Sequence, residues 1–331
     1  MAKVIYFNID DNLDYENKLL REWNIKDIEL AEIKDKSPGK FAGYLADADG
    51  LVVEYEQVTR EVIEQCPKLK CVSVQSIGYN NLDVKGATDL GVCLTNAPGF
   101  CAPEVALHTI GLLIDLVRKI TYYDKSVRAG KWDPLAGYKT GRISGMTFGM
   151  VFFGQIPKAM LPMLKALELE VLVYAPTKTK EYLAGYGCEK AETLDDLLEK
   201  SDFVSLHCPL IKGVTYHLIG EPQLRKMKKT AFLLNTARGA VVDEQALIKA
   251  LTEGWIKGAG IDVIEDETNE QSGLFKLNEN VVITPHAAFM SEDSFYAARR
   301  IALEQLVQRL HDKKLPSNLV NKDVKVDFSK D

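Results

Sequence analysis

The chain lacks a long apolar run, a surplus of basic residues and any closely spaced cysteine pair. Its longest apolar stretch, residues 110–116, contains Asp115 and is far shorter than the ~20 residues that span a bilayer. Lys and Arg number 41 against 47 Asp and Glu, which gives a net charge of −6 and no electrostatic support for binding a phosphate backbone. We therefore expect neither a membrane-embedded chain nor a nucleic-acid partner.

The cysteines are scattered and form no C-x-x-C motif, so we expect free thiols in a reducing compartment and no metal site. They are Cys66, Cys71, Cys93, Cys101, Cys188 and Cys208. The apolar run at residues 1–6 leads into Asp10 and Asp11, and it is too short and too acidic for a secretory signal. These features predict a cytoplasmic protein.

What the 331 residues do contain is a repeated alternation of short apolar runs and helical patterns. The expected strands are residues 3–7, 50–53, 69–74, 147–153, 170–174, 203–207, 231–235, 257–263 and 281–284. The expected helices between them include 14–23, 59–65 (with Thr59 as a cap), 157–167, 193–200 and 243–253. Parallel neighbouring strands require crossover helices of this kind. The prediction is an α/β protein with two doubly wound, parallel-sheet (Rossmann-like) domains and an interdomain cleft.

The two strand series are joined by long helical patterns, which suggest a discontinuous first domain. We expect a substrate domain from residues 1–100 and 300–331, and a dinucleotide-binding domain from 101–299. One long helix is predicted over 103–130 and another over 292–311, followed by a return strand or tail at 315–321. The first helix carries an apolar stripe that indicates either a homodimer seam or burial within its own subunit: Leu107, Ile110, Leu113, Ile114 and Val117.

A dinucleotide fold needs a glycine turn after the first strand of its sheet. Placed on G-x-G-x-x-G, this segment offers Phe152, Gly154 and Pro157, so only the middle glycine is present. That glycine lets the backbone approach a pyrophosphate, with Gln155 and Ile156 following at the helix start. Pro157 is tolerable in a first helical turn, whereas the ring of Phe152 is harder to accommodate. Alone, the loop fits an ordinary strand–turn–helix equally well.

The strand at 170–174 should be followed by an acid that binds the adenosine ribose, but Ala175 stands there. Thr177 and Lys178 follow, and loss of the acid removes repulsion against a 2′-phosphate that a hydroxyl and an ammonium could bind. We therefore expect NADPH to be preferred over NADH. The alternative is a pair of solvated lysines, Lys178 and Lys180, beside an altered cofactor site.

Four motifs in the second half carry a resemblance to a known family. They are S-L-H-C-P-L at 205–210, L-N-T-A-R-G-A-V-V-D at 234–243, G-I-D-V-I-E-D-E at 260–267 and T-P-H-A-A at 284–288. In this order, together with N-A-P-G at 96–99 and G-K-W at 130–132, they closely resemble the D-isomer-specific 2-hydroxyacid dehydrogenases. The resemblance covers nearly the whole chain.

The resemblance implies a catalytic set of Arg238, Glu267 and His286, and the chemistry of these side chains supports it. Histidine can hold or release a proton near neutral pH. A neighbouring carboxylate favours the imidazolium and orients it. Arginine binds carboxylate and carbonyl oxygens through its fork of donors. Such a set suits the reduction of a 2-oxo acid.

Other positions transfer from the family as cofactor or substrate contacts. Asp262 matches the acid beside the nicotinamide carboxamide, and Thr236 and Cys208 match positions that line the cofactor. Ile77 and Gly78 match the loop whose N–H groups bind the substrate carboxylate. The departures from the family pattern are Phe152, Pro157, Ala175 and, before His108, Leu107 in place of Glu.

Because the catalytic set is intact and most departures concern the cofactor, we expect a working NAD(P)(H)-dependent D-2-hydroxyacid dehydrogenase. His286 would be its acid/base, a small 2-oxo or 2-hydroxy acid its substrate, and a homodimer its assembly. Two alternatives remain. The loop at Phe152 could accept an unusual cofactor, or the chain could be a non-catalytic, nucleotide-sensing scaffold or corepressor.

Overall fold

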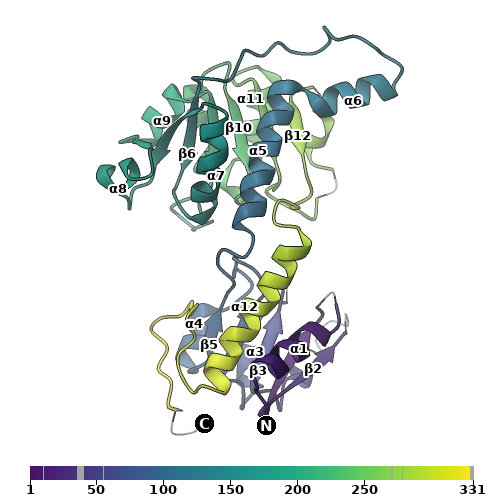
Figure 1. The fold of residues 1–331 in the computed structure, drawn as a ribbon, viewed down its shortest axis with the longest axis vertical. Helices are drawn as coiled ribbons and strands as arrows, with labels where there is room; N and C mark the ends of the chain where they lie inside the picture. The colour runs from purple at the N-terminus through teal and green to yellow at the C-terminus, as the bar shows by residue number, and fades with distance from the viewer. Residues whose placement is uncertain (10, 36–40, 55, 270, 278, 329–331) are drawn as a thin grey trace. The chain divides into compact units, whose positions relative to one another are not determined.

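The computed structural model describes residues 1–331 except 10, 36–40, 55, 270, 278 and 329–331. The chain divides into two compact units, the first formed by Met1–Cys101 with Ser291–Asp331 and the second by Ala102–Met290 (Figure 1). The chain returns to the first unit at Ser291, earlier than the predicted residue 300, and Tyr296 near the start of the C-terminal helix already contacts Tyr15 of that unit. Each unit is an α/β fold, as the sequence predicts.

The first unit is a parallel sheet flanked by helices, with strand order β2-β1-β3-β4-β5. Its strands are β1 (Ala2–Phe7), β2 (Ile28–Ile33), β3 (Gly50–Val53), β4 (Cys71–Val74) and β5 (Cys93–Thr95). Its helices are α1 (Asp14–Glu22), α2 (Phe41–Tyr44), α3 (Arg60–Glu64), α4 (Val84–Asp89) and α12 (Glu292–Leu310). Thr59 occupies the N-cap position of α3, as predicted, although its side chain makes no capping hydrogen bond.

Helix α12 lies directly on the sheet of the first unit, next to α1 (Figure 1). The approach is close at Gly50, where a Cβ atom would stand 2.9 Å from a methyl carbon of Leu306. Of the two alternatives predicted for residues 315–321, a return strand or a tail, the chain forms the tail. Leu319 makes a single bridge to Thr95 and Val320 donates a hydrogen bond to the Leu94 carbonyl at 2.8 Å.

A buried ion pair joins α1 to α12. The guanidinium of Arg299 donates to both carboxylate oxygens of Glu16, at 2.7 and 2.5 Å, and both side chains are fully buried. It also donates to Asp11 at 2.8 Å. Burial opposes the charge on Arg299, but the carboxylates of Glu16 and Asp11 raise its pKa overall. The pair therefore holds its charge inside the first unit.

Replacing Glu16 by Gln should lower the free energy of unfolding by about 3–5 kcal/mol, because it leaves a buried cation without its main partner. Urea unfolding measures the loss. The control is Glu64→Gln, which breaks the exposed Arg60–Glu64 pair and should cost no more than about 1 kcal/mol. An equal loss of unfolding free energy in the two variants would show that the buried Glu16–Arg299 pair stabilises the protein no more than an exposed pair does.

The second unit is a parallel sheet with strand order β12-β11-β10-β9-β6-β7-β8. Its strands are β6 (Thr147–Val151), β7 (Glu170–Tyr174), β8 (Glu189–Lys190), β9 (Phe203–Leu206), β10 (Phe232–Asn235), β11 (Gly258–Ile261) and β12 (Val281–Ile283). Its helices are α5 (Ala102–Arg118), α6 (Ile120–Arg128), α7 (Gln155–Ala166), α8 (Lys180–Ala184), α9 (Leu194–Lys200), α10 (Glu221–Lys226) and α11 (Glu244–Thr252), with short 3₁₀ turns η1 (Gly239–Val241) and η2 (Gly273–Lys276). The order reverses at β6, where doubly wound sheets bind their ligands.

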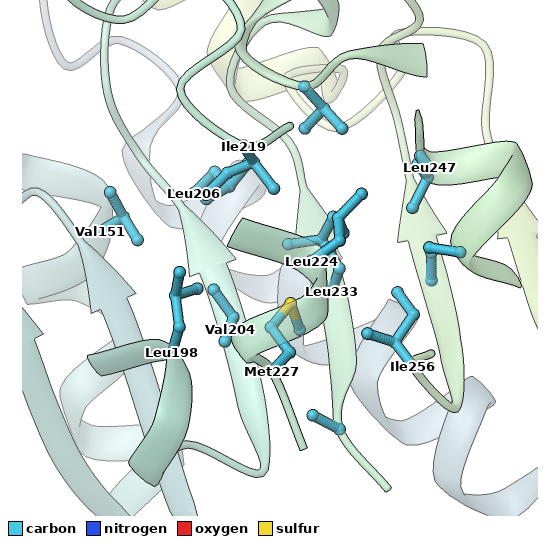
Figure 2. Packing of buried hydrophobic residues seen from close by; sticks show 14 of the residues in the cluster. Val151, Leu198, Val204, Leu206, Ile219, Leu224, Met227, Leu233, Leu247 and Ile256 are labelled. Atoms are coloured by element: carbon cyan, nitrogen blue, oxygen red, sulfur yellow. The ribbon is translucent and has the colours of Figure 1, made fainter. Parts of the chain in front are cut away.

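Both faces of this sheet are covered by apolar side chains, which holds its strand ends in fixed positions. On one face, residues of β9 and β10 such as Val204 and Leu233 pack against Leu198 of α9, Leu224 of α10 and Leu247 of α11 (Figure 2). On the other face, α5 and α7 contribute a second buried cluster. The continuous burial explains why these strands are apolar on both sides.

The long helix predicted over 103–130 is two helices. α5 ends at Arg118, Lys119 adopts a left-handed φ of +57°, and α6 begins at Ile120. The carboxylate of Asp115 accepts hydrogen bonds from the N–H and the hydroxyl of Thr121 across the break. The break therefore depends on side-chain bonds that the apolar pattern does not reveal.

The apolar stripe of α5 is mostly used within its own unit. Ile110, Leu113 and Val117 are buried against the sheet, so for these residues the reading as a dimer seam is wrong. Leu107 is 64% exposed. Other large apolar side chains exposed in this region are Ile120, Val127, Trp132 and Leu135.

Candidate active site

The three side chains expected to be catalytic follow the carboxyl ends of three neighbouring strands. Arg238 comes after β10, Glu267 after β11 and His286 after β12. Because adjacent parallel strands lie ~4.8 Å apart, their following loops emerge side by side at one edge of the sheet. Topology alone thus brings the three loops together.

Glu267 and His286 are in direct contact. The imidazole Nδ1 of His286 lies 3.0 Å from the Glu267 carboxylate, and the two side chains are 41% and 47% exposed. Both line a pocket of about 460 Å³, together with Asp262, Thr284 and Phe275. The Nδ1–H donates to the carboxylate, which leaves Nε2 as the ring atom that can exchange a proton with a ligand.

The backbone around His286 is held in an unusual shape by Asp262. His286 has a left-handed φ of +52°, and its N–H donates to the Asp262 carbonyl at 2.7 Å. The buried Asp262 carboxylate accepts from the N–H groups of Ala287 and Ala288, at 2.9 and 3.0 Å, and from the Thr284 hydroxyl at 2.5 Å. Asp262 therefore positions the loop that carries His286, a role that the sequence did not reveal.

His108 extends this arrangement from α5. Its Nε2 lies 2.9 Å from the Thr284 hydroxyl and 3.6 Å from the Asp262 carboxylate. Since the Thr284 hydroxyl already donates to Asp262, His108 Nε2 must be the donor in its bond to Thr284. His108, the residue after Leu107, thus reaches the candidate site through the Thr284 hydroxyl.

Arg238 is placed by the close approach of two loops. Its guanidinium Nη1 donates to the Ala237 carbonyl at 2.6 Å. At the next residue, Gly239, a Cβ atom would stand 1.7 Å from the Ile264 carbonyl oxygen, in the loop that leads to Glu267. Only glycine permits this contact, so the loops of Arg238 and Glu267 pack directly on each other.

A polar brace that the sequence did not predict ties the same loops together. The Glu265 carboxylate lies 2.7 Å from Nε2 of His217, and the His217 N–H donates to the Ala240 carbonyl at 2.9 Å. The Glu265 N–H donates to Glu244 at 3.1 Å, and Glu244 also accepts from the Ser272 hydroxyl at 2.6 Å. The segment between Asp262 and Glu267 is therefore supported from both sides.

The nucleotide loop keeps a glycine-like backbone despite its substitutions. Phe152 has a left-handed φ of +72°, its N–H donates to the Tyr174 carbonyl at 2.7 Å, and its ring packs partly buried against the core. Gly154 is the N-cap of α7, and a Cβ there would meet nothing within 4 Å. Pro157 lies in the first turn of the helix, as predicted. The first-turn N–H groups of Gln155 and Ile156 have no acceptor within the helix and so fit a pyrophosphate.

Replacing Phe152 by Gly should relieve a left-handed conformation that costs a non-glycine residue roughly 1–2 kcal/mol. The lost ring packing opposes this gain, so we expect little net change in melting temperature. If the ring narrows the entry of the pyrophosphate, the variant should bind NADPH about threefold to tenfold more tightly, as measured by fluorescence titration. Weaker binding would instead show that the ring supports the cofactor.

The other expected cofactor residues also stand at the carboxyl edge of the sheet. Cys208 follows β9 and is buried, and burial raises the pKa of its thiol to about 11. Thr236 follows β10 and its hydroxyl lies 2.9 Å from that of Thr109 on α5. Thr177 and Lys178 follow β7 by a few residues, beyond the buried Ala175. The sequence therefore placed all of them at strand ends.

Ile77 and Gly78 belong to the first unit, in the loop after β4. The loop is tied by carbonyl oxygens: Ile77 accepts from the Asn96 amide at 2.8 Å, and Gly78 accepts from the Ser76 hydroxyl at 2.5 Å. The Ser76 carbonyl accepts from the Ala97 N–H at 2.9 Å. These bonds fix the turn without using the N–H groups of Ile77 and Gly78.

His207, in the S-L-H-C-P motif, is held neutral. Its Nε2 lies 2.9 Å from the Ser205 hydroxyl, and burial lowers the pKa of His207 to about 3. Within the described ranges no three His, Cys, Asp or Glu side chains gather in a way that could hold a metal ion. No helix in the part of the chain that the structure describes is long and apolar enough to cross a membrane.

Comparison with known proteins identifies a family model that matches the second unit. Residues 110–288 match the family model described as "D-isomer specific 2-hydroxyacid dehydrogenase, NAD binding domain". The chain is 40% identical over 286 residues to a glyoxylate reductase of Thermococcus litoralis. The alignment covers 84% of this chain and 85% of that protein.

Two solved structures share the fold over almost the whole chain. The NAD-complexed D-isomer specific 2-hydroxyacid dehydrogenase of Lactobacillus delbrueckii ssp. bulgaricus is 26% identical, with a TM-score of 0.78 and coverage of 97% of this chain and 100% of that one. An acyclic imino acid reductase in complex with NADPH and D-Arg is 27% identical, with a TM-score of 0.84 and coverage of 96% and 100%.

The two parallel sheets and the nucleotide-binding unit define a Rossmann-type oxidoreductase. The chain belongs to the D-isomer-specific 2-hydroxyacid dehydrogenase family, as its motifs indicated.

Proposed function

We propose that the protein reversibly reduces a 2-oxo acid to a D-2-hydroxy acid, using His286 as the acid/base. The observation that carries this proposal is the contact of 3.0 Å between His286 Nδ1 and the Glu267 carboxylate in one pocket. The relative from Thermococcus litoralis is named a glyoxylate reductase, which makes small 2-oxo acids the first substrates to test.

Each side chain has a defined task in this reaction. A bound nicotinamide supplies the hydride that the carbonyl carbon accepts. His286 gives the proton on Nε2 to the carbonyl oxygen, while Glu267 holds Nδ1–H and stabilises the imidazolium. Arg238 binds the substrate carboxylate and polarises the carbonyl, and the N–H groups of Ile77 and Gly78 bind the same carboxylate.

The expected cofactor is NAD(P)(H), with NADPH preferred. Gly154, Gln155 and Ile156 would hold the pyrophosphate, and Thr236, Cys208 and Asp262 would line the nicotinamide side. The absence of an acid at Ala175, with Thr177 and Lys178 beyond it, supports the choice of NADPH. The imino acid reductase structure contains NADPH, whereas the Lactobacillus structure contains NAD, so the shared fold accommodates both.

We also propose a homodimer. The support is the exposure of Leu107, Ile120, Trp132 and Leu135, of which Trp132 is 87% exposed. Several exposed large apolar side chains within residues 107–135 are consistent with a protein interface, because such side chains are commonly covered by a partner. Light scattering coupled to size-exclusion chromatography measures the assembly directly, and a monomer at micromolar concentration would contradict the proposal.

The experiment that tests the function is a fluorescence titration with NADPH and NADH, followed by turnover with a panel of 2-oxo acids beginning with glyoxylate. Saturable binding together with turnover supports the proposal. Equal or better turnover with NADH would overturn the preference for NADPH alone. Binding without turnover of any 2-oxo acid would favour a non-catalytic nucleotide-sensing role.

A further inference from the structure

Two lysines and three aromatic rings form a cluster beside the nucleotide loop. We call Lys158, Lys178, Tyr182 and Tyr186 the lysine–tyrosine cluster, with Phe153 behind it. The Lys158 Nζ lies 4.9 Å from the ring centre of Tyr186 and 5.6 Å from that of Tyr182. The Lys178 Nζ lies 5.0 Å from the same Tyr182 ring. Both ammonium groups therefore converge on one phenol.

The rings hold each other in place. Phe153 is buried and contacts Tyr186 and Tyr182 edge-on, with ring centres 5.4 and 6.4 Å apart. The Tyr182 and Tyr186 centres are 5.3 Å apart, and the two side chains remain 37% and 42% exposed. The cluster thus has a rigid base and an open side.

The positive charge of the lysine–tyrosine cluster has no carboxylate partner among the described residues. In the part of the chain that the structure describes, no carboxylate lies within salt-bridge distance of Lys158 or Lys178, although Glu181 is only three residues from Lys178 in the sequence. The phenol oxygens of Tyr182 and Tyr186 raise the pKa of Lys158, and Lys158 first and then Tyr186 lower the pKa of Tyr182. Two like charges share one ring, and an anion placed between them would relieve their repulsion.

The cluster lies where an adenosine ribose is expected in a dinucleotide fold. Lys158 lies in the first turns of α7, whose N-cap is Gly154. Lys178 follows the end of β7 by four residues. β6 and β7 are paired neighbours, with Val151 opposite Tyr174. At this place the usual ribose-binding acid is replaced by the buried Ala175, so no carboxylate at that position repels a phosphate.

We propose that Lys158 and Lys178, held by Tyr182 and Tyr186, form a binding site for the 2′-phosphate of the cofactor's adenosine ribose. The inference rests on the proposed nicotinamide cofactor and assigns its selectivity to Lys158 of α7 and to the two tyrosines, as well as to Lys178. A phosphate monoester carries nearly two negative charges at neutral pH, which matches two ammonium groups. A ribose without this phosphate offers no charge for either lysine.

The test uses nucleotide fragments, so that it is independent of turnover. Isothermal titration calorimetry of the full-length protein compares 2′,5′-ADP with 5′-ADP. The wild-type protein should bind 2′,5′-ADP at least about tenfold more tightly, since charge-assisted hydrogen bonds contribute that much. Lys158→Gln and Lys178→Gln should each lower the affinity for 2′,5′-ADP by about tenfold and leave the affinity for 5′-ADP unchanged.

Lys180→Gln is the matched control, because it removes the same charge from an exposed neighbour and should leave both affinities unchanged. Tyr182→Leu should lower the affinity for 2′,5′-ADP without changing the affinity for 5′-ADP. Thermal unfolding checks that each variant is folded. Equal wild-type affinity for the two nucleotides would overturn the proposal. So would an effect of Lys180→Gln as large as that of Lys158→Gln, or competition by inorganic phosphate as strong as that by 2′,5′-ADP.

The outcome is separable from the proposed reduction. Selective binding of 2′,5′-ADP by a protein that turns over no 2-oxo acid would confirm the phosphate site and contradict the enzyme. Turnover of 2-oxo acids with NADH, without selectivity for 2′,5′-ADP, would confirm the enzyme and contradict the phosphate site.

Discussion

Replacing His286 by Asn is expected to lower kcat for 2-oxo acid reduction by about a thousandfold, the scale of a lost general acid. Asn is chosen because it tolerates the left-handed φ of +52° at this position, so the loop keeps its shape. Steady-state kinetics measures kcat, and fluorescence titration measures the Kd of NADPH. The Kd should change less than about threefold, because the imidazole acts on the substrate.

A second histidine–carboxylate pair provides the control. His311 Nδ1 lies 2.7 Å from Asp27, in the first unit, with exposure similar to that of the His286 pair. His311→Asn should leave kcat unchanged. A His286→Asn variant with kcat close to that of the wild type would remove His286 from the mechanism. Glu267→Gln should lower kcat less than His286→Asn, because it weakens the imidazolium without removing it.

Replacing Gly239 by Ala is expected to damage both activity and stability. Its Cβ would stand 1.7 Å from the Ile264 carbonyl oxygen, which is backbone and cannot rotate away. The loops of Arg238 and Glu267 must therefore separate, and a displacement near 1 Å at a catalytic group can cost about a hundredfold in rate. We expect kcat/KM to fall by about that factor and the melting temperature to fall with it.

Gly111 provides the matched control for this substitution. It lies within α5, and a Cβ there would meet nothing within 4 Å. Gly111→Ala should be neutral or stabilise the protein by up to about 1 kcal/mol, the difference in helix propensity. Normal kinetics in Gly239→Ala would show that the two loops can move apart without disturbing the site.

The sequence predicted the fold class and many of the strands, because buried parallel strands are continuous apolar runs. The predicted bounds of β3 (Gly50–Val53) and β7 (Glu170–Tyr174) agree with the structure. Three strands at sheet edges were missed: β2, because most of its side chains are not buried, and β5 and β8, because they have only three and two residues. The break at Lys119 was also missed, because it depends on the bonds between Asp115 and Thr121.

The residues of the candidate site were predicted from motifs. The contacts that hold their loops in place were not predicted. Arg238, Glu267 and His286 are visible in sequence as polar residues after strands. The contact between Glu265 and His217 joins positions far apart in the chain and has no local signal. The glycine after Arg238 was a usable signal for close packing, because N-T-A-R-G places it directly after a predicted strand.

Phe152 shows how a substitution can keep the local geometry that it was expected to break. The sequence indicates that a ring at this turn is hard to accommodate. In the structure the backbone retains a φ of +72°, which a glycine would adopt without strain, and the ring packs on the core. The conformation is held by the neighbouring strand, since the Phe152 N–H bonds to Tyr174.

The most direct test of the central claim is the oxidation of NADPH by the purified protein in the presence of glyoxylate and larger 2-oxo acids. The loss of reduced nicotinamide absorbance reports the rate, and chiral chromatography of the product from a larger acid reports its configuration. We expect turnover that depends on His286 and yields the D-hydroxy acid. Tight binding of NADPH with no oxidation by any 2-oxo acid, or an L-hydroxy acid product, would contradict it.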